Sequence, residues 1–253
     1  LNYATFGNHE FDIKENQFKQ RLQEAKFTWI SSNVLNADGR SLSNVHQNLI
    51  IPFTDKKSGK SFKIGIFGLT LTTNKPDYIS YTDPLTTAGN QVRQLAKTAD
   101  FIIALTHQTM DDDIQLLQAY PQIALLLGGH EHTNFQNWRG NFTPLLKADA
   151  NVRSVYVIDI YYHLQTGKTE IKPTFVPIND TLTEDTTVKA VVDQWMKIAF
   201  DAFREQGFQP EQVVAITKES LDGLASNVRS TSTNLTQLIA QSMLRAYPDT
   251  DLS

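Results

Sequence analysis

The sequence contains no cysteine, no long apolar run and no excess of basic residues. The absence of cysteine excludes a disulfide framework, a thiolate nucleophile and cysteine-ligated zinc sites. No apolar stretch approaches the ~20 residues that span a bilayer, so no transmembrane segment is expected. Acidic and basic residues are interspersed around a net charge of -4, which does not provide the basic stripe that a nucleic-acid polymer requires. A small anionic substrate remains compatible with this charge if metal ions supply the positive charge.

The chain has enough length and apolar content for a substantial core. Its 253 residues are 40% hydrophobic, which is sufficient for one large domain and part of another. Strand-like and helix-like segments alternate, as is typical of a layered α/β domain. We expect strands at 27–33, 101–105 and 123–127, hairpins pairing 45–53 with 62–69 and 154–160 with 169–176, and helices at 13–26, 84–99 and 111–120.

The composition changes after about residue 177. Residues 184–206 have the apolar spacing of one long helix, which we interpret as a connector between domains. A strand is expected at 212–221 and a last helix at 235–246. The predicted organisation is therefore a catalytic domain at 1–180, a linker helix within 181–208 and the beginning of a second domain at 209–253.

Three short clusters carry the candidate chemistry. They are Gly7-Asn8-His9-Glu10-Phe11-Asp12, Thr106-His107, and Gly128-Gly129-His130-Glu131-His132-Thr133, and the last two directly follow predicted strands. Open α/β sheets place their chemistry where parallel strands end, so we expect the clusters to converge. Neutral imidazoles and an amide oxygen are suitable ligands for divalent cations, and they are provided by Asn8, His107, His130 and His132. Because His130 and His132 are two residues apart in a loop, they could serve different cations, which favours a two-metal site.

His9 has a different expected role from its neighbour Asn8. Adjacent residues of an irregular loop diverge, so Asn8 can face a metal while His9 faces the substrate, with Asp12 placed to orient the imidazole. In phosphate-ester hydrolysis, a protonated His9 would stabilise the transferring phosphoryl group or protonate the departing oxygen. A metal-bound hydroxide would be the nucleophile.

Each of these residues also has an ordinary structural interpretation when taken alone. Asn8 suits a turn, His107 suits a hydrogen-bonded strand end, and a His-x-His pair is often a surface feature. Their combination with glycine-led loops and strand ends favours a site. Glu131 could ligate a metal, but a solvated or supporting role is favoured. The other candidate groups are expected to be structural: helix capping for Asp111, Asp112 and Asp113, and surface placement for His46 and His163.

The clusters resemble the later motif blocks of the calcineurin-like metallophosphoesterases, and most closely those of the 5'-nucleotidase / UDP-sugar hydrolase branch. The segments Phe27-Thr28-Trp29-Ile30-Ser31-Ser32-Asn33 and Ile64-Gly65-Ile66-Phe67-Gly68-Leu69-Thr70 resemble the same branch, as does the stretch from Val228 to Leu235. The resemblance implies a four-layer α/β sandwich of two mixed sheets flanked by helices, followed by a linker helix and the start of a second α/β domain. It also implies hydrolysis of nucleoside 5'-monophosphates or nucleotide-sugars, and export to the periplasm or the extracellular space.

The resemblance assigns site roles to individual residues. Asn8, His107 and His130 would hold one cation, His132 would bind the other, and His9 with Asp12 would form the catalytic pair. Arg229, together with Asn8, would bind the substrate, a small-molecule nucleotide. The two divalent cations would be drawn from zinc, manganese, iron, cobalt and magnesium. No oligomeric state is predicted.

The sequence also departs from the family pattern. Ala225 stands where the family tends to place a further arginine, and the glycine that often follows the strand-end histidine is absent after His107. The family's earlier Asp-x-His and Gly-Asp blocks should precede Leu1, so we expect a chain truncated at both ends that is inactive by itself. Three alternatives remain open: a 2',3'-cyclic nucleotide phosphodiesterase/3'-nucleotidase, a sulfur-ester hydrolase of the same superfamily, or a degenerate binding protein without catalysis.

Overall fold

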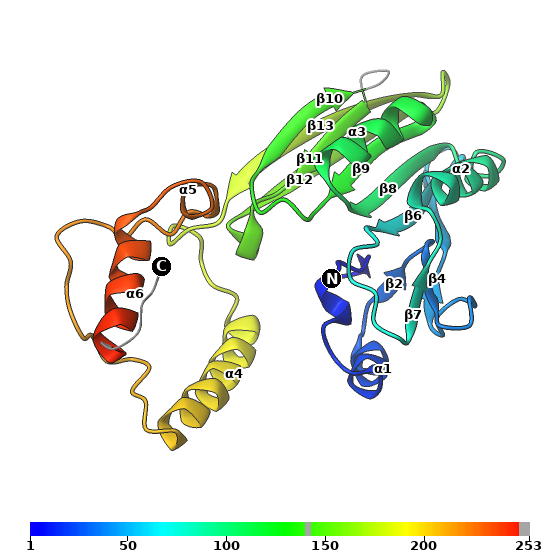
Figure 1. The fold of residues 1–253 in the computed structure, drawn as a ribbon. Coiled ribbons are helices and arrows are strands. Elements are labelled where there is room, and N and C mark those ends of the chain that lie inside the picture. Colours follow the sequence, from blue (N-terminus) through cyan, green and yellow to red (C-terminus); the bar gives the residue numbers. More distant parts are fainter. Residues whose placement is uncertain (140–142, 248–253) are drawn as a thin grey trace. The chain divides into compact units, whose positions relative to one another are not determined.

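A computed structural model describes residues 1–139 and 143–247 of the chain (Figure 1). The chain divides into two compact units, Leu1–Leu182 and Thr183–Ser253, which are described separately. The first unit contains β1 (Tyr3–Ala4), η1 (His9–Phe11), α1 (Glu15–Glu24), β2 (Thr28–Ile30), β3 (Val34–Asn36), β4 (Val45–His46), β5 (Asn48–Thr54), β6 (Ser61–Thr70), β7 (Ile79–Tyr81), α2 (Pro84–Leu95), β8 (Phe101–His107), α3 (Met110–Ala119), β9 (Ile123–Gly128), β10 (Phe135–Arg139), β11 (Thr143–Lys147), η2 (Ala150–Val152), β12 (Ser154–His163) and β13 (Lys168–Pro177).

A six-stranded mixed sheet forms the centre of this unit, with strand order β10-β11-β9-β8-β6-β5. The four inner strands, β11, β9, β8 and β6, run parallel, while β5 and β10 pair antiparallel at the two edges. Parallel strands covered on both faces are apolar along their whole length, which explains the run Ile-Ala-Leu-Leu-Leu in β9. The register aligns Thr70 with His107, Thr106 with Gly128, and Gly128 with Lys147. The carboxyl ends of the inner strands therefore meet at one edge of the sheet.

Helices and smaller sheets cover the two faces of the central sheet. On one face α2 and α3 bury a core that includes Leu95, Leu116 and Leu126 (Figure 1). Side chains of β12 and β13 pack against the opposite face, where Ile30 of β2 joins them. The helix α1 packs by Phe18 against a third cluster beside the small sheet β1-β2-β4. These layers are the α/β arrangement that the sequence predicts.

Gly68 lets β2 pass closely over β6. A Cβ atom at this position would lie 2.7 Å from Thr5 Oγ1 and would overlap the carbonyl oxygen of Ile30. Ser32 N donates to the carbonyl of Gly68 at 2.8 Å, so the two strands are held at this separation. The N-terminal segments can reach the strand ends of the central sheet because glycine occupies this position.

Replacing Gly68 by alanine is expected to lower the free energy of unfolding by about 1–3 kcal/mol, because the added methyl group forces two backbone segments apart. Urea denaturation measures the change. Gly39→Asn is the matched control: Gly39 has a φ of 79° and nothing within 4 Å of its Cβ position, and asparagine tolerates this backbone conformation. Equal unfolding midpoints for Gly68→Ala and the unmodified protein would contradict the prediction.

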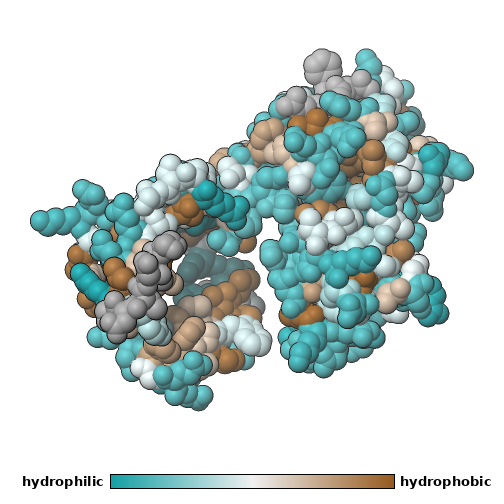
Figure 2. All heavy atoms as spheres, in the orientation of Figure 1, coloured by the Kyte–Doolittle hydropathy of each residue, from teal (hydrophilic) through white to brown (hydrophobic). Residues whose placement is uncertain are grey.

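The second unit consists of helices over its described residues, 183–247: α4 (Thr186–Glu205), α5 (Ala225–Val228) and α6 (Asn234–Ala246). Asp185 caps α4 and Thr233 caps α6 through hydrogen bonds to backbone amides. Apolar side chains are exposed on this unit (Figure 2), among them Val188 and Trp195 of α4, each 61% exposed. The role of α4 as a connector between two domains stays a prediction. Across residues 1–139 and 143–247, no helix is both long enough and apolar enough to cross a membrane.

Most of the expected elements form, but the expectation differs from the structure in several places. Residues 45–46 form β4 beside β2 and do not join the hairpin of β5 and β6, and the antiparallel pair β3 and β7 was not expected. The strand expected at 212–221 is irregular, with Val214 and Ile216 88% and 91% exposed. A strand needs a neighbour for its backbone hydrogen bonds, and residues 183–247 form no sheet. The antiparallel pair β10 and β11 was not expected; it extends the central sheet beyond β9.

Candidate active site

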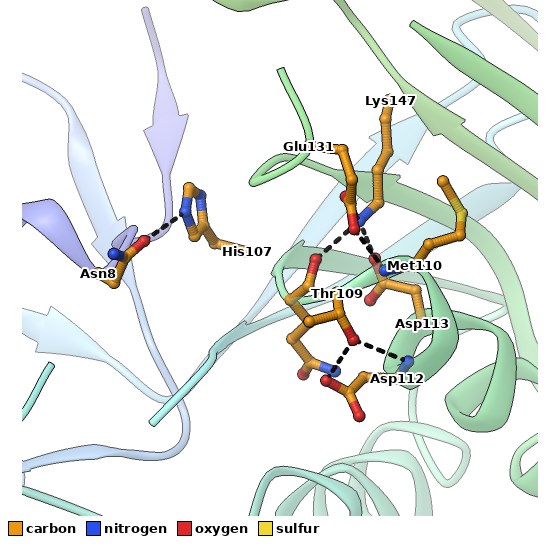
Figure 3. A network of polar contacts seen from close by, with 9 residues as sticks. Asn8, His107, Thr109, Met110, Asp112, Asp113, Glu131 and Lys147 are labelled. Atoms are coloured by element: carbon orange, nitrogen blue, oxygen red, sulfur yellow. Dashed lines mark hydrogen bonds and ion pairs between the residues drawn. The ribbon is translucent and has the colours of Figure 1, made fainter. Parts of the chain in front are cut away.

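The N-terminal loop and the end of β8 meet at the carboxyl edge of the central sheet. Thr70, the last residue of β6, donates its hydroxyl proton to the carbonyl of Phe6 at 2.8 Å, and Phe6 is fully buried. This anchor brings Asn8 to the neighbouring strand end, where Asn8 Oδ1 lies 3.0 Å from His107 Nε2 (Figure 3). Two of the predicted ligands, 99 residues apart in the sequence, are thus in direct contact.

His130 approaches the same point from the loop after β9. Its ring centroid lies 5.2 Å from that of His107, with an interplanar angle of 67°. The backbone of His130 has a φ of 81°, in the left-handed region that non-glycine residues rarely adopt. Strained backbone of this kind concentrates at functional sites because the surrounding structure has to impose it.

Gly7 is required by the close packing around His107. A Cβ atom on Gly7 would lie 2.8 Å from His107 Cε1 and 2.9 Å from Glu10 Oε2. The backbone amide of Gly7 donates to the same Glu10 oxygen at 2.6 Å, which closes the loop that carries Asn8 and His9. Glycine at this position therefore permits the contact between Asn8 and His107.

The His9–Asp12 pair lies on the outer side of this loop. His9 Nδ1 and Asp12 Oδ2 are 2.6 Å apart, and the two side chains are 76% and 54% exposed. Asn74, from the segment between β6 and β7, donates its amide group to Asp12 Oδ1 at 2.5 Å and to the carbonyl of Asn8 at 3.0 Å. Tyr81 in turn donates its hydroxyl proton to the carbonyl of Asn74 at 2.5 Å. Asn74 was missed in the sequence because no local pattern distinguishes a loop asparagine that bonds a distant loop.

The electrostatics of His107 favour a neutral imidazole. Burial lowers the pKa of His107 to about 4, and the nearby His130, Lys147 and His9 act in the same direction. A neutral imidazole keeps a lone pair for a metal. The 3.0 Å between Asn8 Oδ1 and His107 Nε2 is close to the spacing of neighbouring ligands on one cation with bonds of about 2.1 Å. The donor set of Asn8, His107 and His130 therefore fits a borderline divalent cation.

This pKa predicts a pH dependence for the metal-free protein. His107 ordinarily titrates near pH 6.5 in the unfolded chain and at about 4 in the fold. Its contribution to stability is complete above pH 6.5 and is lost as the pH falls from 6.5 through 4, because the unfolded state takes up the proton first. We expect His107→Gln to reduce the loss of stability across this window.

The measurement is urea unfolding in the presence of a chelator at several pH values between 4 and 7. Burial raises the pKa of Asp113 to about 6, so the contribution of Asp113 to stability changes with pH in the opposite direction. The unmodified protein and the His107→Gln variant are therefore compared, because both contain Asp113. Parallel curves for the two proteins would contradict the prediction.

Within the described part of the first unit, residues 1–139 and 143–182, no contact brings His132 to this cluster, and Arg229 belongs to the second unit. The side chain of His132 is exposed, and its backbone carbonyl accepts a hydrogen bond from Ala150 at 3.3 Å. Arg229 caps the end of α5 in the second unit and is exposed. Over the same residues, no three His, Asp or Glu side chains gather as a metal cluster would. The candidate site instead combines two histidines with an asparagine.

A buried ionic cluster lies behind the histidines. Lys147, at the end of β11, is 1% exposed and pairs with Asp113 Oδ2 at 2.9 Å and with Glu131 (Figure 3). The interpretation of Asp113 as a helix cap is wrong: Thr109 caps α3 by accepting from Asp112 N, and the Asp113 side chain turns inward to the lysine. Glu131 belongs to this cluster, and its supporting role beside a metal stays a prediction. The surface placement expected for His46 and His163 is confirmed.

Electrostatic effects within the cluster differ between its two acids. Burial raises the pKa of Asp113 although Lys147 opposes the shift. Burial also opposes ionisation of Glu131, but the hydrogen bond and charge of Lys147 outweigh it and lower the pKa of that carboxyl group. Glu131 is therefore an ionised partner of the buried ammonium group at neutral pH.

Comparison with known proteins assigns the family. The family model for calcineurin-like phosphoesterases matches residues 1–134, more than half of the chain and all three motif clusters. The chain belongs to the calcineurin-like phosphoesterases. The resemblance inferred from the motifs is thereby confirmed, and divalent metal binding is implied by the family.

Relatives of this phosphoesterase include nucleotide hydrolases. The chain is 27% identical to the trifunctional nucleotide phosphoesterase protein YfkN of Bacillus subtilis, over 95% of this chain and 19% of that protein. It is 29% identical to a snake venom 5'-nucleotidase of Naja atra, over 79% of this chain and 42% of that one. The chain thus spans less than half of the length of either relative.

A solved structure shows the same fold. The 5'-nucleotidase precursor from Thermus thermophilus superposes with a TM-score of 0.75 at 22% identity, covering 98% of this chain and 52% of that one. This likeness confirms the layered metallophosphoesterase architecture predicted from the sequence.

Proposed function

We propose that the protein hydrolyses phosphate esters with two divalent cations, and that its substrates are nucleoside 5'-monophosphates or nucleotide-sugars. The observation that carries the proposal is the meeting of Asn8, His107 and His130 at one sheet edge, with the His9–Asp12 pair on the adjoining loop. Ligands for cations and a proton donor thereby lie next to each other. The printed names of the relatives, nucleotide phosphoesterase and 5'-nucleotidase, favour nucleotides as the substrate class.

In this proposal Asn8, His107 and His130 hold one cation and His132 contributes to the second. Bound divalent cations supply positive charge to the phosphate oxygens and make water more acidic. The protein contributes the fixed positions of these ligands and a neutral imidazole at His107. The carbonyl of Asn8 is engaged by Asn74, which leaves the Asn8 side-chain oxygen directed at His107.

The His9–Asp12 pair controls one proton. Asp12 accepts from Nδ1 of a protonated His9, which leaves Nε2–H available for the substrate. Water oxygen forms the new bond to phosphorus, the bond between phosphorus and the ester oxygen breaks, and His9 Nε2 gives its proton to that leaving oxygen. A proton released from the water restores the protonated imidazole. The products are an alcohol and inorganic phosphate from a nucleoside monophosphate, or a nucleoside monophosphate and a sugar phosphate from a nucleotide-sugar.

The remaining parts of the proposal concern recognition and location. Arg229 binds the substrate phosphate through its guanidinium group, assisted by the Asn8 side chain. Export to the periplasm or the extracellular space is proposed on the basis of relatives such as the venom 5'-nucleotidase.

The test is a substrate panel with the protein as its gene encodes it. AMP, UDP-glucose, 2',3'-cyclic AMP, 3'-AMP and a thiosulfate ester are supplied with Mn²⁺, Zn²⁺ or a chelator. We expect metal-dependent release of phosphate from AMP, or of UMP and glucose 1-phosphate from UDP-glucose, and a fall of more than ~100-fold in His130→Ala, since losing a ligand exceeds the effect of losing its support. His46→Ala, a change of an exposed histidine, is the matched control. Activity confined to the cyclic, 3'- or sulfur ester would establish the corresponding alternative, and no activity would favour a binding protein.

A further inference from the structure

Lys147 occupies an unusual position for a charged residue. It ends the fully buried strand β11 and lies in parallel register beside Gly128, the last residue of β9. Its side chain is completely excluded from solvent. An apolar residue would fill this position at lower cost, because removing an ammonium group from water is expensive unless it is fully paired.

The ammonium group has two hydrogen-bond acceptors and a further ion-pair partner. Lys147 Nζ donates to the carbonyl of Gln108 at 2.7 Å, lies 2.9 Å from Asp113 Oδ2 and donates to Glu131 Oε2 (Figure 3). The second oxygen of Glu131 accepts from the backbone amide of Met110 at 2.5 Å. One lysine therefore connects two loops and the first turn of α3.

These two loops are the ones that carry the predicted ligands. Gln108 directly follows His107, and Glu131 stands between His130 and His132. The chain passes close over the lysine stem between them, since a Cβ atom on Gly128 would lie 2.7 Å from Lys147 Cε. The loop backbone thus rests on Lys147, while the imidazole rings of His107 and His130 meet edge to face.

We propose that Lys147 is a positioning residue for the metal site: through Glu131 and the Gln108 carbonyl it holds the His107 and His130–His132 segments at their mutual spacing. The inference rests on the proposed function for the role of these histidines as ligands. Glu131 is the connection between the ammonium group and the second loop. Lys147 does not touch the substrate or the reacting atoms.

Glu131→Ala tests this connection most directly. The variant removes the link to the loop but leaves Lys147 paired with Asp113 and the Gln108 carbonyl, so the buried charge stays compensated. Leu95→Ala is the matched control: Leu95 is 1% exposed in the core under α2, and its truncation costs about 2–5 kcal/mol without touching the site. If Lys147 were merely structural, Glu131→Ala and Leu95→Ala would have the same effect on the loop and on metal binding.

Two readouts are measured on the protein as its gene encodes it. Amide hydrogen exchange of residues 129–133 is followed by mass spectrometry in the absence of metal, and Mn²⁺ binding is followed by titration calorimetry. We expect Glu131→Ala to speed exchange in 129–133 at least ~10-fold and to weaken Mn²⁺ binding by roughly 10–100-fold, the usual effect of removing support from a ligand. Leu95→Ala should neither speed exchange in residues 129–133 more than elsewhere nor weaken Mn²⁺ binding.

The outcomes separate this inference from the proposed function. Exchange and Mn²⁺ affinity unchanged in Glu131→Ala would make Lys147 purely structural and overturn the inference, as would faster exchange with unchanged affinity. If the unmodified protein binds no Mn²⁺, the proposed function fails. In that case hydrogen exchange still tests whether the loop is positioned. Faster exchange of residues 129–133 in Glu131→Ala supports a positioned loop, and unchanged exchange refutes it.

Discussion

Replacing Lys147 by methionine is expected to lower the free energy of unfolding by about 3–5 kcal/mol. Methionine nearly matches the length of the lysine stem, but it leaves the fully buried Asp113 and the partly exposed Glu131 without their cation. Breaking a buried ion pair by removing one partner is strongly destabilising for this reason. Urea unfolding at pH 7 measures the change, and a loss below ~1 kcal/mol would show that the cluster is easily reorganised.

A variant without any charge in the cluster separates stability from positioning. In Lys147→Met with Asp113→Leu and Glu131→Leu, no uncompensated charge remains, and apolar replacement of a buried ionic cluster is often neutral or stabilising. We expect this triple variant to recover most of the stability lost in Lys147→Met. The exchange protection of residues 129–133 should not recover with it, because the link through Glu131 is absent.

His9→Ala is expected to lower kcat by about 10²–10⁴-fold on the best substrate of the panel, the usual contribution of a general acid. Mn²⁺ affinity should stay within about threefold, because the contact of the His9 side chain is with the exposed carboxylate of Asp12 and not with the predicted ligands. Steady-state kinetics and calorimetry measure the two quantities. His163→Ala, which changes an exposed histidine at the end of β12, is the control.

Asn74→Ala examines the support of the same pair. The variant loses hydrogen bonds to Asp12 and to the Asn8 carbonyl, so kcat should fall by an intermediate factor of about tenfold, equivalent to one hydrogen bond. A decrease in His9→Ala of less than about threefold would remove His9 from the proposed chemistry, whatever the result for Asn74.

The match between sequence and structure differs among the elements. The run Ile123 to Leu127 is predictable as a strand because a buried parallel strand is apolar throughout, and α4 is predictable because its apolar residues recur at helical spacing. Residues 212–221 contain the apolar run Val213-Val214-Ala215-Ile216 but form no strand, since strand formation depends on a partner. Local composition cannot distinguish these two outcomes.

The candidate site also contains residues that were predictable from the sequence and residues that were not. Asn8, His107 and His130 were predictable because glycine-led loops and strand ends are local features of the sequence. Their 3.0 Å contact and 5.2 Å ring separation depend on the register of β6, β8 and β9. The roles of Asn74 and Lys147 were not predictable, because their partners come from distant loops.

The sequence by itself determined which residues could act as ligands and acids, where the helices and most strands of the central sheet lie, and to which family the chain belongs. These properties follow from residue chemistry, periodicity and motif spacing, all of which are local. Only the tertiary structure decided that Asn74 bonds the loop of His9, and that Lys147 underlies both histidine-bearing loops. The reason is physical. A buried polar group needs a hydrogen-bond partner. Strand register and crossovers decide which distant segment lies beside the group and supplies that partner.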